Sequence, residues 1–416
     1  MAKRVMSLFS GCGGMDLGFE GGFPVFGACL GTGGHADWVA GEISADRVRL
    51  RENDYEIVFA NDINERAKLA WVNYFARRGY PGSIYRTESI VDIMNGHGLN
   101  GHGLPRGVDV LTGGFPCQDF SVAGKRQGFS SGKNHRGEPR RDQSEEGRGS
   151  LYLWMKKAIE AVGPKVFVAE NVKGLVSLSR AKDIIVSDFA KSNDDGYLMV
   201  SPRVLLSANY GVPQSRERVI FMGFSKKALR PEALAALSMD VIPHEYDPYP
   251  PVTHGDRTRP SLWGQRGNGV RDFVPSGTVL LDLPEPGQAA DPAQRKHSRA
   301  RYLDNGSQGQ TEIDLSRIAP TIRSEHHGNI EYRRLSQAHG GRHLGELGRG
   351  LPERRLTVRE CARLQTFPDD YGFVFESPAG NLSASAAYKL IGNAVPPLLA
   401  YHIAKRLERN WEAYFG

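Results

Sequence analysis

The first half of the chain alternates short apolar runs with stretches of helical periodicity. Runs of about four to eight apolar residues that end in glycine or in polar residues are typical of buried parallel strands. We expect strands at 3–9, 56–62, 108–114, 165–171, 197–206 and 218–224, and helices at 63–75, 150–162 and 181–191. This repeated β-α order predicts an α/β fold with an open, mostly parallel sheet covered by helices.

The pattern changes after residue 224. From about 225 to 353 the chain is rich in Gly, Pro, Arg and His and has few sustained periodic runs. The strand-like pieces 277–283 and 319–324 favour a small folded domain over a disordered insertion. Regular patterns return at 356–367, and residues 385–410 predict a helix, a proline bend and a second helix.

We therefore expect two domains of unequal size in this chain of 416 residues. The larger domain would comprise residues 1–224, completed by 380–416. The smaller domain would comprise 225–379, with the irregular stretch of about 225–350 as its variable part. Residues 27–55 separate the first strand from the second and would form an inserted loop or hairpin.

Composition excludes some classes of protein without choosing among the rest. Hydrophobic residues make up 40% of the chain and charged residues 24%, as in ordinary soluble globular proteins. No stretch approaches the length of a membrane span, and the first residues lack the pattern of a signal peptide, so we expect a cytosolic or nuclear protein. The net charge of +6 permits a polyanionic partner.

Cysteine usage argues against both disulfides and zinc. The four cysteines, Cys12, Cys29, Cys117 and Cys361, are scattered without close pairs or C-x-x-C spacing. A disulfide framework is not expected in so large a chain, and no metal site is indicated. Any chemistry at Cys117 should therefore belong to a single thiol.

Cys117 lies in "GGFPCQDFSVAGK", just beyond the third apolar run, where ligands bind in doubly wound sheets. A lone cysteine is usually a buried structural residue. Here the surrounding chain reads as a glycine-hinged polar loop, and the nearby cations Lys125 and Arg126 would favour a thiolate. The loop therefore favours a nucleophilic cysteine.

A glycine-rich turn follows the first strand in "LFSGCGGMDLGF". Gly11, Gly13 and Gly14 would allow a ligand to approach the backbone closely. Asp62 ends the second strand, where an acid typically holds the ribose hydroxyls of a nucleoside cofactor, and Ile63 follows as a candidate to stack on the adenine. An acid at a strand end is by itself more often a helix cap, but the two features together favour an adenosine-containing cofactor.

Further polar groups follow later strands. Glu170 and Asn171 come after the apolar residues 166–169, and a carboxyl group that faces a pocket there could donate a proton. Arg216 and Arg218 are two residues apart at the start of a strand, so their side chains should share one face. Such a pair is either a surface ion-pair feature or a clamp for an anionic group.

The order of six motifs resembles the cytosine-5 DNA methyltransferases, especially the compact bacterial type II modification enzymes. The motifs are "LFSGCGG", "FPCQDFS", "ENVKGL", "QSRERVIFMGF", "RLTVRECARLQTFPDDY" and "AYKLIGNAVPP". The resemblance spans nearly the whole chain except residues 225–350. It implies a Rossmann-like methyltransferase fold with a smaller, irregular target-recognition domain. The cofactor it implies is S-adenosylmethionine, released as S-adenosylhomocysteine, with no metal.

The resemblance also assigns roles. Cys117 matches the nucleophile that adds to C6 of a flipped-out cytosine, Glu170 the residue that engages the base, and Arg218, with Arg216 beside it, the group that steadies both. Gln118 and Ser121 fall on the active-site loop. The cofactor residues it implies are Phe9, Cys12, Gly13, Gly14, Asp62, Ile63, Ile90, Pro116, Leu151, Asn393 and Val395.

One contact remains unassigned, because the stretch "ESIVDI" departs from the family pattern near the adenine amino group. Glu88, Ser89 and Asp92 are candidates there. The implied partners are double-stranded DNA and a cognate restriction endonuclease acting on the same site. The resemblance further implies a monomer that acts near the bacterial nucleoid in the cytoplasm and has no membrane partner.

Three alternatives stay open. The nearest is an RNA (tRNA) cytosine-5 methyltransferase that uses the same chemistry, although the variable segment is large for that role. A nucleic-acid-binding module without catalysis would not need Cys117, Glu170 and Arg218. A dinucleotide oxidoreductase would carry G-x-G-x-x-G, which the glycine turn lacks.

Overall fold

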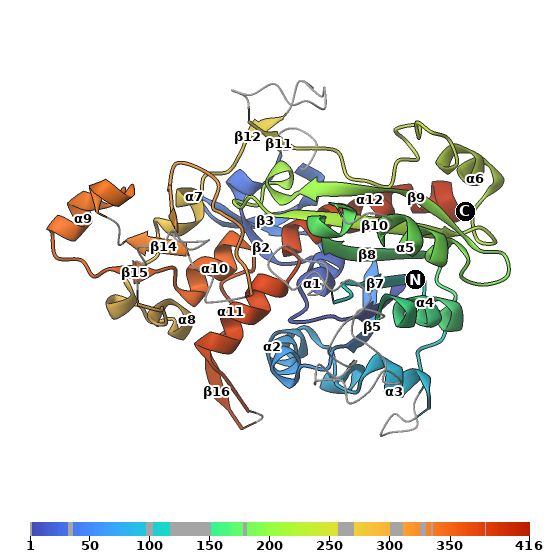
Figure 1. The fold of residues 1–416 in the computed structure, drawn as a ribbon, viewed down its shortest axis with the longest axis horizontal. Helices are drawn as coiled ribbons and strands as arrows, with labels where there is room; N and C mark the ends of the chain where they lie inside the picture. The colour runs from blue at the N-terminus through green and yellow to red at the C-terminus, as the bar shows by residue number, and fades with distance from the viewer. Residues whose placement is uncertain are drawn as a thin grey trace.

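The computed structural model describes residues 2–31, 36–96, 103–116, 151–177, 181–256, 270–299, 311–324, 330–333, 336–378 and 380–416. Its centre is a seven-stranded sheet in the order β6-β5-β1-β7-β8-β10-β9 (Figure 1). The strands are β1 (Lys3–Leu8), β5 (Tyr55–Asn61), β6 (Tyr85–Arg86), β7 (Val110–Gly113), β8 (Val166–Val172), β9 (Tyr197–Leu206) and β10 (Glu217–Ser225).

The expected sheet is confirmed. Neighbouring strands run parallel, except that β10 is antiparallel to both β8 and β9. All six expected strands are present, and each lies within a few residues of its predicted bounds. The two-residue strand β6 adds an edge that is too short to recognise as an apolar run. Loops at the carboxyl ends of the parallel strands can therefore meet at one edge of the sheet.

Both faces of the sheet are buried. In β8, Val166 and Val168 belong to one apolar cluster, whereas Phe167 and Ala169 belong to another, as strand alternation requires. The first cluster includes side chains of the helices α1 (Gly14–Glu20), α2 (Glu65–Phe75) and α12 (Pro397–Phe415). The second includes α3 (Ile90–Met94), α4 (Leu151–Val162) and α5 (Ala181–Ala190).

Helix bounds follow from local chemistry. The helix expected at 63–75 begins at Glu65, because the Asn64 side chain accepts a hydrogen bond from Arg66 N and caps the first turn. The expected helices 150–162 and 181–191 are also confirmed, as is the bend at 385–410. There α11 (Ala384–Asn393) ends before Pro396, and α12 follows. None of the helices in the described residues is long and apolar enough to cross a membrane.

The chain between β10 and α11 forms shorter elements, many of which lie on the left of Figure 1. They are α6 (Pro231–Leu237), β11 (His254–Gly255), β12 (Arg271–Asp272), α7 (Gly277–Leu280), α8 (Pro292–Arg295), β13 (Thr311–Glu312), β14 (Ile330–Arg333), α9 (Leu344–Gly348), β15 (Arg354–Arg355), α10 (Val358–Leu364), β16 (Phe375–Ser377) and β17 (Gly380–Leu382). Two almost fully buried arginines tie these elements together: Arg333 pairs with Glu285 at 2.6 Å and Arg354 with Glu360 at 2.8 Å.

Two strand predictions in this region were wrong. Residues 277–283 begin as the helix α7, because short apolar runs do not distinguish a buried strand from a helical turn. Residues 319–324 form no strand. An isolated β-bridge connects Ala319 to Gln214. The elements of this region are joined by buried ion pairs, and many of their apolar side chains belong to the same cluster as those of α1, α2 and α12. A separate smaller domain remains a prediction.

The insertion after the first strand is a hairpin, one of the two forms expected. β2 (Pro24–Phe26), β3 (Val39–Ser44) and β4 (Arg47–Leu50) form an antiparallel sheet in the order β2-β4-β3. Trp38, at its base, packs edge-on against Tyr401 and His402 of α12, with ring centroids 5.3 and 4.8 Å away. The insertion is therefore packed against the folded core through Trp38, while most of β3 is exposed.

An ionic ring joins the insertion to the shorter elements. Arg47 of β4 lies 2.6 Å from both Asp282 and Asp369. Arg363 of α10 lies 2.5 Å from Asp282 and 2.7 Å from Asp369. Two arginines and two aspartates thus alternate around a closed ring, and both guanidinium groups lie within 5.4 Å of the Phe26 ring centre.

Candidate functional site

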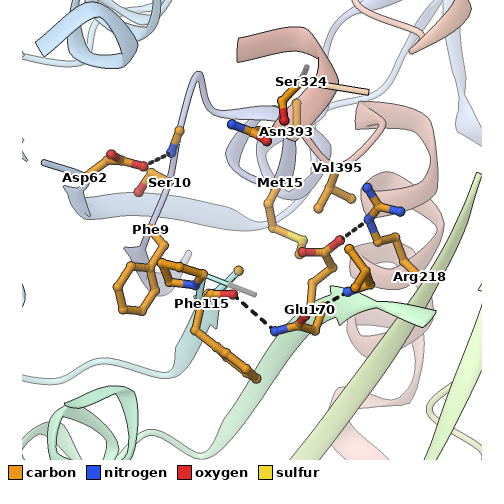
Figure 2. Close-up of a pocket in the computed structure, with 18 of the residues that line it drawn as sticks. Phe9, Ser10, Met15, Asp62, Phe115, Glu170, Arg218, Ser324, Asn393 and Val395 are labelled. Carbon is orange, nitrogen blue, oxygen red and sulfur yellow. Dashed lines mark hydrogen bonds and ion pairs between the residues drawn. The ribbon is translucent and has the colours of Figure 1, made fainter. Parts of the chain in front are cut away.

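A cavity of about 730 Å³ opens at the carboxyl ends of the parallel strands (Figure 2). Its volume is within the range of small-molecule sites, and its position is the one expected for a doubly wound sheet. Residues from β1, β5, β7 and β8 meet there with the segment that follows α11. The predicted site residues that line it are Phe9, Gly14, Asp62, Ile63, Ile90, Pro116, Leu151, Glu170, Arg218, Asn393 and Val395.

One wall of the cavity is the glycine turn, residues 9–14. Phe9 has a φ of 53°, which is uncommon for a residue with a side chain, and the turn reverses the chain between β1 and α1. A Cβ atom on Gly14 would collide with the carbonyl oxygen of Val395. Gly14 therefore lets the first turn of α1 lie directly against the segment after α11, and Val395 lies across from Met15 in Figure 2.

Asp62 anchors the same wall. Its Oδ2 accepts a hydrogen bond from Gly11 N at 3.0 Å, and its Oδ1 accepts one from Asn64 N at 2.9 Å. Burial raises the pKa of this carboxyl group, while those two hydrogen bonds oppose the shift. A carboxylate has further acceptor sites and donates nothing, so Asp62 fits a ligand with hydroxyl donors, such as the ribose of a nucleoside.

Two predicted cofactor residues of this turn, Cys12 and Gly13, are not among the residues that line the cavity. Cys12 is buried, and its Sγ lies 3.7 Å from the Leu390 carbonyl oxygen. Burial raises the pKa of this thiol far above its usual value. A Cβ on Gly13 would lie 2.6 Å from Trp71, so Gly13 faces α2. Their role in cofactor binding therefore remains a prediction, and it would have to involve their backbone atoms.

Glu88, Ser89 and Asp92 were the candidates for the expected contact with an adenine amino group. The Glu88 carboxylate is held by Arg86, whose Nη2 lies 2.5 Å from Oε1. Ser89 lines the cavity together with Ile90, and its Oγ caps α3. Among these three residues, Ser89 is the one that lines the cavity.

Glu170 and Arg218 form the opposite end of the cavity. Glu170 Oε1 lies 2.6 Å from Arg218 Nε, and both side chains are largely buried. Glu170 lies within β8, which ends at Val172, one residue beyond the predicted strand 165–171. Asn171, on the other face of β8, donates its Nδ2 to the Phe115 carbonyl at 3.1 Å and so fixes the chain leading to Pro116 (Figure 2).

Arg216 is not in the cavity wall, although the sequence suggested that it lies in the pocket beside Arg218. Its side chain is fully buried. Nη1 donates to the Ile322 carbonyl at 3.1 Å and Nη2 to the Gly392 carbonyl at 3.0 Å. Burial, and next the charge of Arg218, lower the pKa of Arg216. The guanidinium group therefore holds backbone in place and does not face the cavity.

Cys117, Gln118 and Ser121 lie outside the described residues, as do Lys125 and Arg126. The described chain reaches Phe115 and Pro116, which both line the cavity.

Sequence reasoning missed part of the wall. Ser10 and Met15 belong to the glycine turn and α1, and the residues Thr321, Ile322, Arg323 and Ser324 come from the segment expected to be a strand. Figure 2 shows Ser324 next to Asn393. The apolar pattern of 319–324 could be seen in the sequence. That this segment lines the cavity could not, because its position depends on contacts with residues far away in the chain. No cluster of His, Cys, Asp or Glu that could hold a metal ion occurs in the described part of the chain.

Comparison with known proteins gives consistent matches. Residues 3–409 match the family described as C-5 cytosine-specific DNA methylase. The chain is 30% identical to the Type II methyltransferase M.BsuRI of Bacillus subtilis, over 98% of this chain and 79% of that one. It is 29% identical to the Type II methyltransferase M.NgoFVII of Neisseria gonorrhoeae, over 97% of this chain and 86% of that one.

Two solved structures support the fold. The S. pombe Dnmt2 methyltransferase is 16% identical, with a TM-score of 0.52 and 98% of both chains covered. The Entamoeba histolytica methyltransferase EhMeth is 14% identical, with a TM-score of 0.53 and 99% of both chains covered. At these identities the likeness concerns the fold alone.

Proposed function

Because the chain belongs to the C-5 cytosine-specific DNA methylase family, we propose that it methylates C5 of one cytosine within a specific sequence of duplex DNA through a covalent adduct of Cys117. One observation carries the proposal. The Glu170–Arg218 pair and the Asp62 wall line the same cavity, which the chain leading to Cys117 enters at Pro116.

The cofactor end fits S-adenosylmethionine. Asp62 would accept the ribose hydroxyls, Ile63 and Ile90 would contact the adenine, and Ser89 would face its amino group. The glycine turn would receive the methionine part, opposite Asn393 and Val395. When bound, this cofactor supplies an electrophilic methyl group on a sulfonium and leaves as S-adenosylhomocysteine.

The base end fits cytosine. The Cys117 thiolate would add to C6, which forms a carbon–sulfur bond and moves the ring electrons toward C5, N3 and O2. Glu170 would protonate or hydrogen-bond N3, and the Arg218 guanidinium beside it would stabilise charge at O2. After C5 takes the methyl group, a base removes the C5 proton. Elimination then restores the C5–C6 double bond and frees the thiolate.

The depth of the site supports an extrahelical base as part of the proposal. Glu170 and Arg218 are largely buried, so a cytosine paired within a duplex could not reach them. The base must therefore rotate out of the stack. We assign the reading of the surrounding sequence to the region of about 225–350, whose arginines and lysines could contact phosphates while other side chains read base edges.

Its relatives carry the name Type II methyltransferase, and we accordingly propose a modification role beside a restriction endonuclease that cuts the same sequence. One chain provides Asp62, Glu170 and Arg218, so a monomer would suffice.

The decisive experiment compares substrates. Purified protein is incubated with labelled S-adenosylmethionine and either unmethylated duplex DNA or tRNA. Label in DNA supports the proposal, whereas label in tRNA alone would replace it with an RNA cytosine-5 methyltransferase. Bisulfite sequencing of plasmid from cells that express the protein would then show whether one sequence context is protected.

A further inference from the structure

Three segments that are far apart in the sequence meet behind the cavity, and we call this meeting point the junction. They are residues 213–218 at the start of β10, residues 319–324, and residues 390–395 at the end of α11. Each contributes to the cavity wall: the first beside Glu170, the last beside the glycine turn, and residues 321–324 between them. The junction thus spans the base end and the cofactor end.

The first two segments are joined by backbone hydrogen bonds. Ser215 N donates to the Ala319 carbonyl at 2.8 Å, and Ala319 N donates to the Pro213 carbonyl at 3.0 Å. Ile322 N donates to Gln214 Oε1 at 3.0 Å, and Thr321 Oγ1 donates to the Ser215 carbonyl at 2.5 Å. Residues 319–322 are therefore fixed to the strand that carries Arg218.

The second and third segments touch backbone to backbone. A Cβ atom on Gly392 would lie 2.5 Å from both Arg323 C and Ser324 N. Only glycine permits this approach, so a shift of α11 by a fraction of an ångström is transmitted directly to residues 323–324.

Arg216 links the two contacts. Its two terminal nitrogens donate to the Ile322 and Gly392 carbonyls, one from each segment. We propose that Arg216 is a positioning residue that couples the two ends of the cavity, so that a ligand at the cofactor wall tightens the binding of DNA at the base end, and the reverse. This inference rests on the proposed function.

Charge explains why an arginine is needed. Arg216 is buried next to Arg218 and Glu170, and its burial lowers its pKa. Hydrogen bonds to two carbonyl oxygens on different segments offset the free-energy cost of burying this charge. The planar guanidinium can donate to both at once, whereas the single ammonium of lysine has no such fork. A lysine would keep the positive charge and lose the bridge.

The test measures a coupling factor, which is the Kd of S-adenosylhomocysteine without DNA divided by its Kd with DNA. The Kd of S-adenosylhomocysteine is measured by calorimetry with and without saturating sheared DNA that carries no methylated cytosine. For the unaltered protein we expect DNA to tighten this Kd by about tenfold, within the usual range for coupled sites. In Arg216→Lys we expect the factor to fall to about twofold or less, while the Kd without DNA changes by less than about threefold.

Arg359→Lys is the matched control. Arg359 is also buried and also donates to two backbone carbonyls, those of Pro368 and Tyr371 at 3.2 Å each. It differs in pairing with Asp291 at 2.6 Å, and it is not among the residues that line the cavity. A merely structural effect would lower the stability of both variants and leave the coupling factor intact. An unchanged factor in Arg216→Lys, or no coupling in the unaltered protein, would overturn the inference.

A second measurement needs no variant. In hydrogen exchange of the unaltered protein without DNA, S-adenosylhomocysteine should slow exchange at 390–395 and also at 213–218, the segment beside Glu170. Protection confined to 390–395 would refute the coupling even if Arg216→Lys does not fold. Failure of the proposed function would look different, because the unaltered protein would then transfer no methyl group to DNA.

Discussion

Glu170 and Arg218 face each other diagonally across two antiparallel strands, with Glu170 Oε1 2.6 Å from Arg218 Nε. The register sets Glu170 opposite Ile220 and Arg218 opposite Val172, which places both side chains on one face of the sheet. The pair therefore presents a carboxyl group and a fixed cation together at the base end of the cavity.

Replacing Arg218 with lysine should lower kcat by about 100- to 1000-fold, because a fixed donor near developing charge is lost. Release of labelled product at saturating cofactor and DNA checks this. Arg230→Lys is the control, since Arg230 is half exposed and pairs weakly with Glu232 at 3.8 Å. Equal activity of the two variants would exclude a catalytic role for Arg218.

Cys117→Ala should abolish methyl transfer while DNA binding persists, because the alanine cannot add to C6. A duplex in which 5-fluorocytosine replaces cytosine should trap a covalent complex with the unaltered protein, visible by denaturing electrophoresis and mass spectrometry. The buried Cys29 provides the control, and Cys29→Ala should still form the adduct. Turnover by Cys117→Ala would contradict the covalent mechanism.

Asp62→Ala should weaken S-adenosylhomocysteine binding by roughly 10- to 100-fold, since hydrogen bonds to charged groups contribute about 1.5–3 kcal/mol. The substitution also leaves Gly11 N and Asn64 N without their acceptor. Calorimetry gives the Kd, and Asp54→Asn, at an exposed carboxyl group paired with Lys3, is the control. An unchanged Kd in Asp62→Ala would remove Asp62 from the cofactor site.

Asp16 should make stability depend on pH. It is buried between Ser7 and Trp71, and burial raises its pKa from 3.8 to about 6. Below about pH 3 the group is mostly protonated in both the folded and the unfolded chain. As the pH rises from 4 through 6, the unfolded chain ionises more readily, so this carboxyl group lowers stability by roughly 3 kcal/mol.

Asp16→Asn should abolish that part of the dependence. Urea unfolding at pH 4 to 7 should show the unaltered protein losing stability relative to Asp16→Asn as the pH rises. Asp54→Asn, at a half-exposed carboxyl group, is the control. A difference between Asp16→Asn and the unaltered protein that stays constant over this range would contradict the assignment.

Breaking the ionic ring should cost stability. In Arg47→Gln, Asp282 and Asp369 each keep Arg363 but lose their second cation, and we expect a loss of about 1–2 kcal/mol that shrinks in molar salt. Arg49→Gln, on the same strand, removes an exposed side chain that donates to one carbonyl and should change stability by less than about 0.5 kcal/mol. Equal losses, measured by urea unfolding, would show that the ring adds nothing.

The sequence was sufficient to predict the sheet and several residues of the cavity wall, because apolar runs mark strands and polar residues after parallel strands meet at one edge. Asp62 and Glu170 were found in this way. The place of Arg216 was not predictable, since the two-residue spacing says nothing of Ile322 and Gly392, which lie more than a hundred residues away. The ionic ring could not be predicted for the same reason, and α7 could not because a four-residue helix makes barely one turn and shows no repeated period.

The contact between Gly14 and Val395 has a consequence for synthesis. The Gly14 side of this contact is translated 381 residues before the Val395 side. At about 5–20 residues per second, the N-terminal part waits some 20–80 s for its counterpart. Until then the face of α1 that will meet α12 has no covering. A chain that stops before residue 395 would hold most of the sheet and lack the completed wall, so we expect such fragments to depend on chaperones and to bind no cofactor.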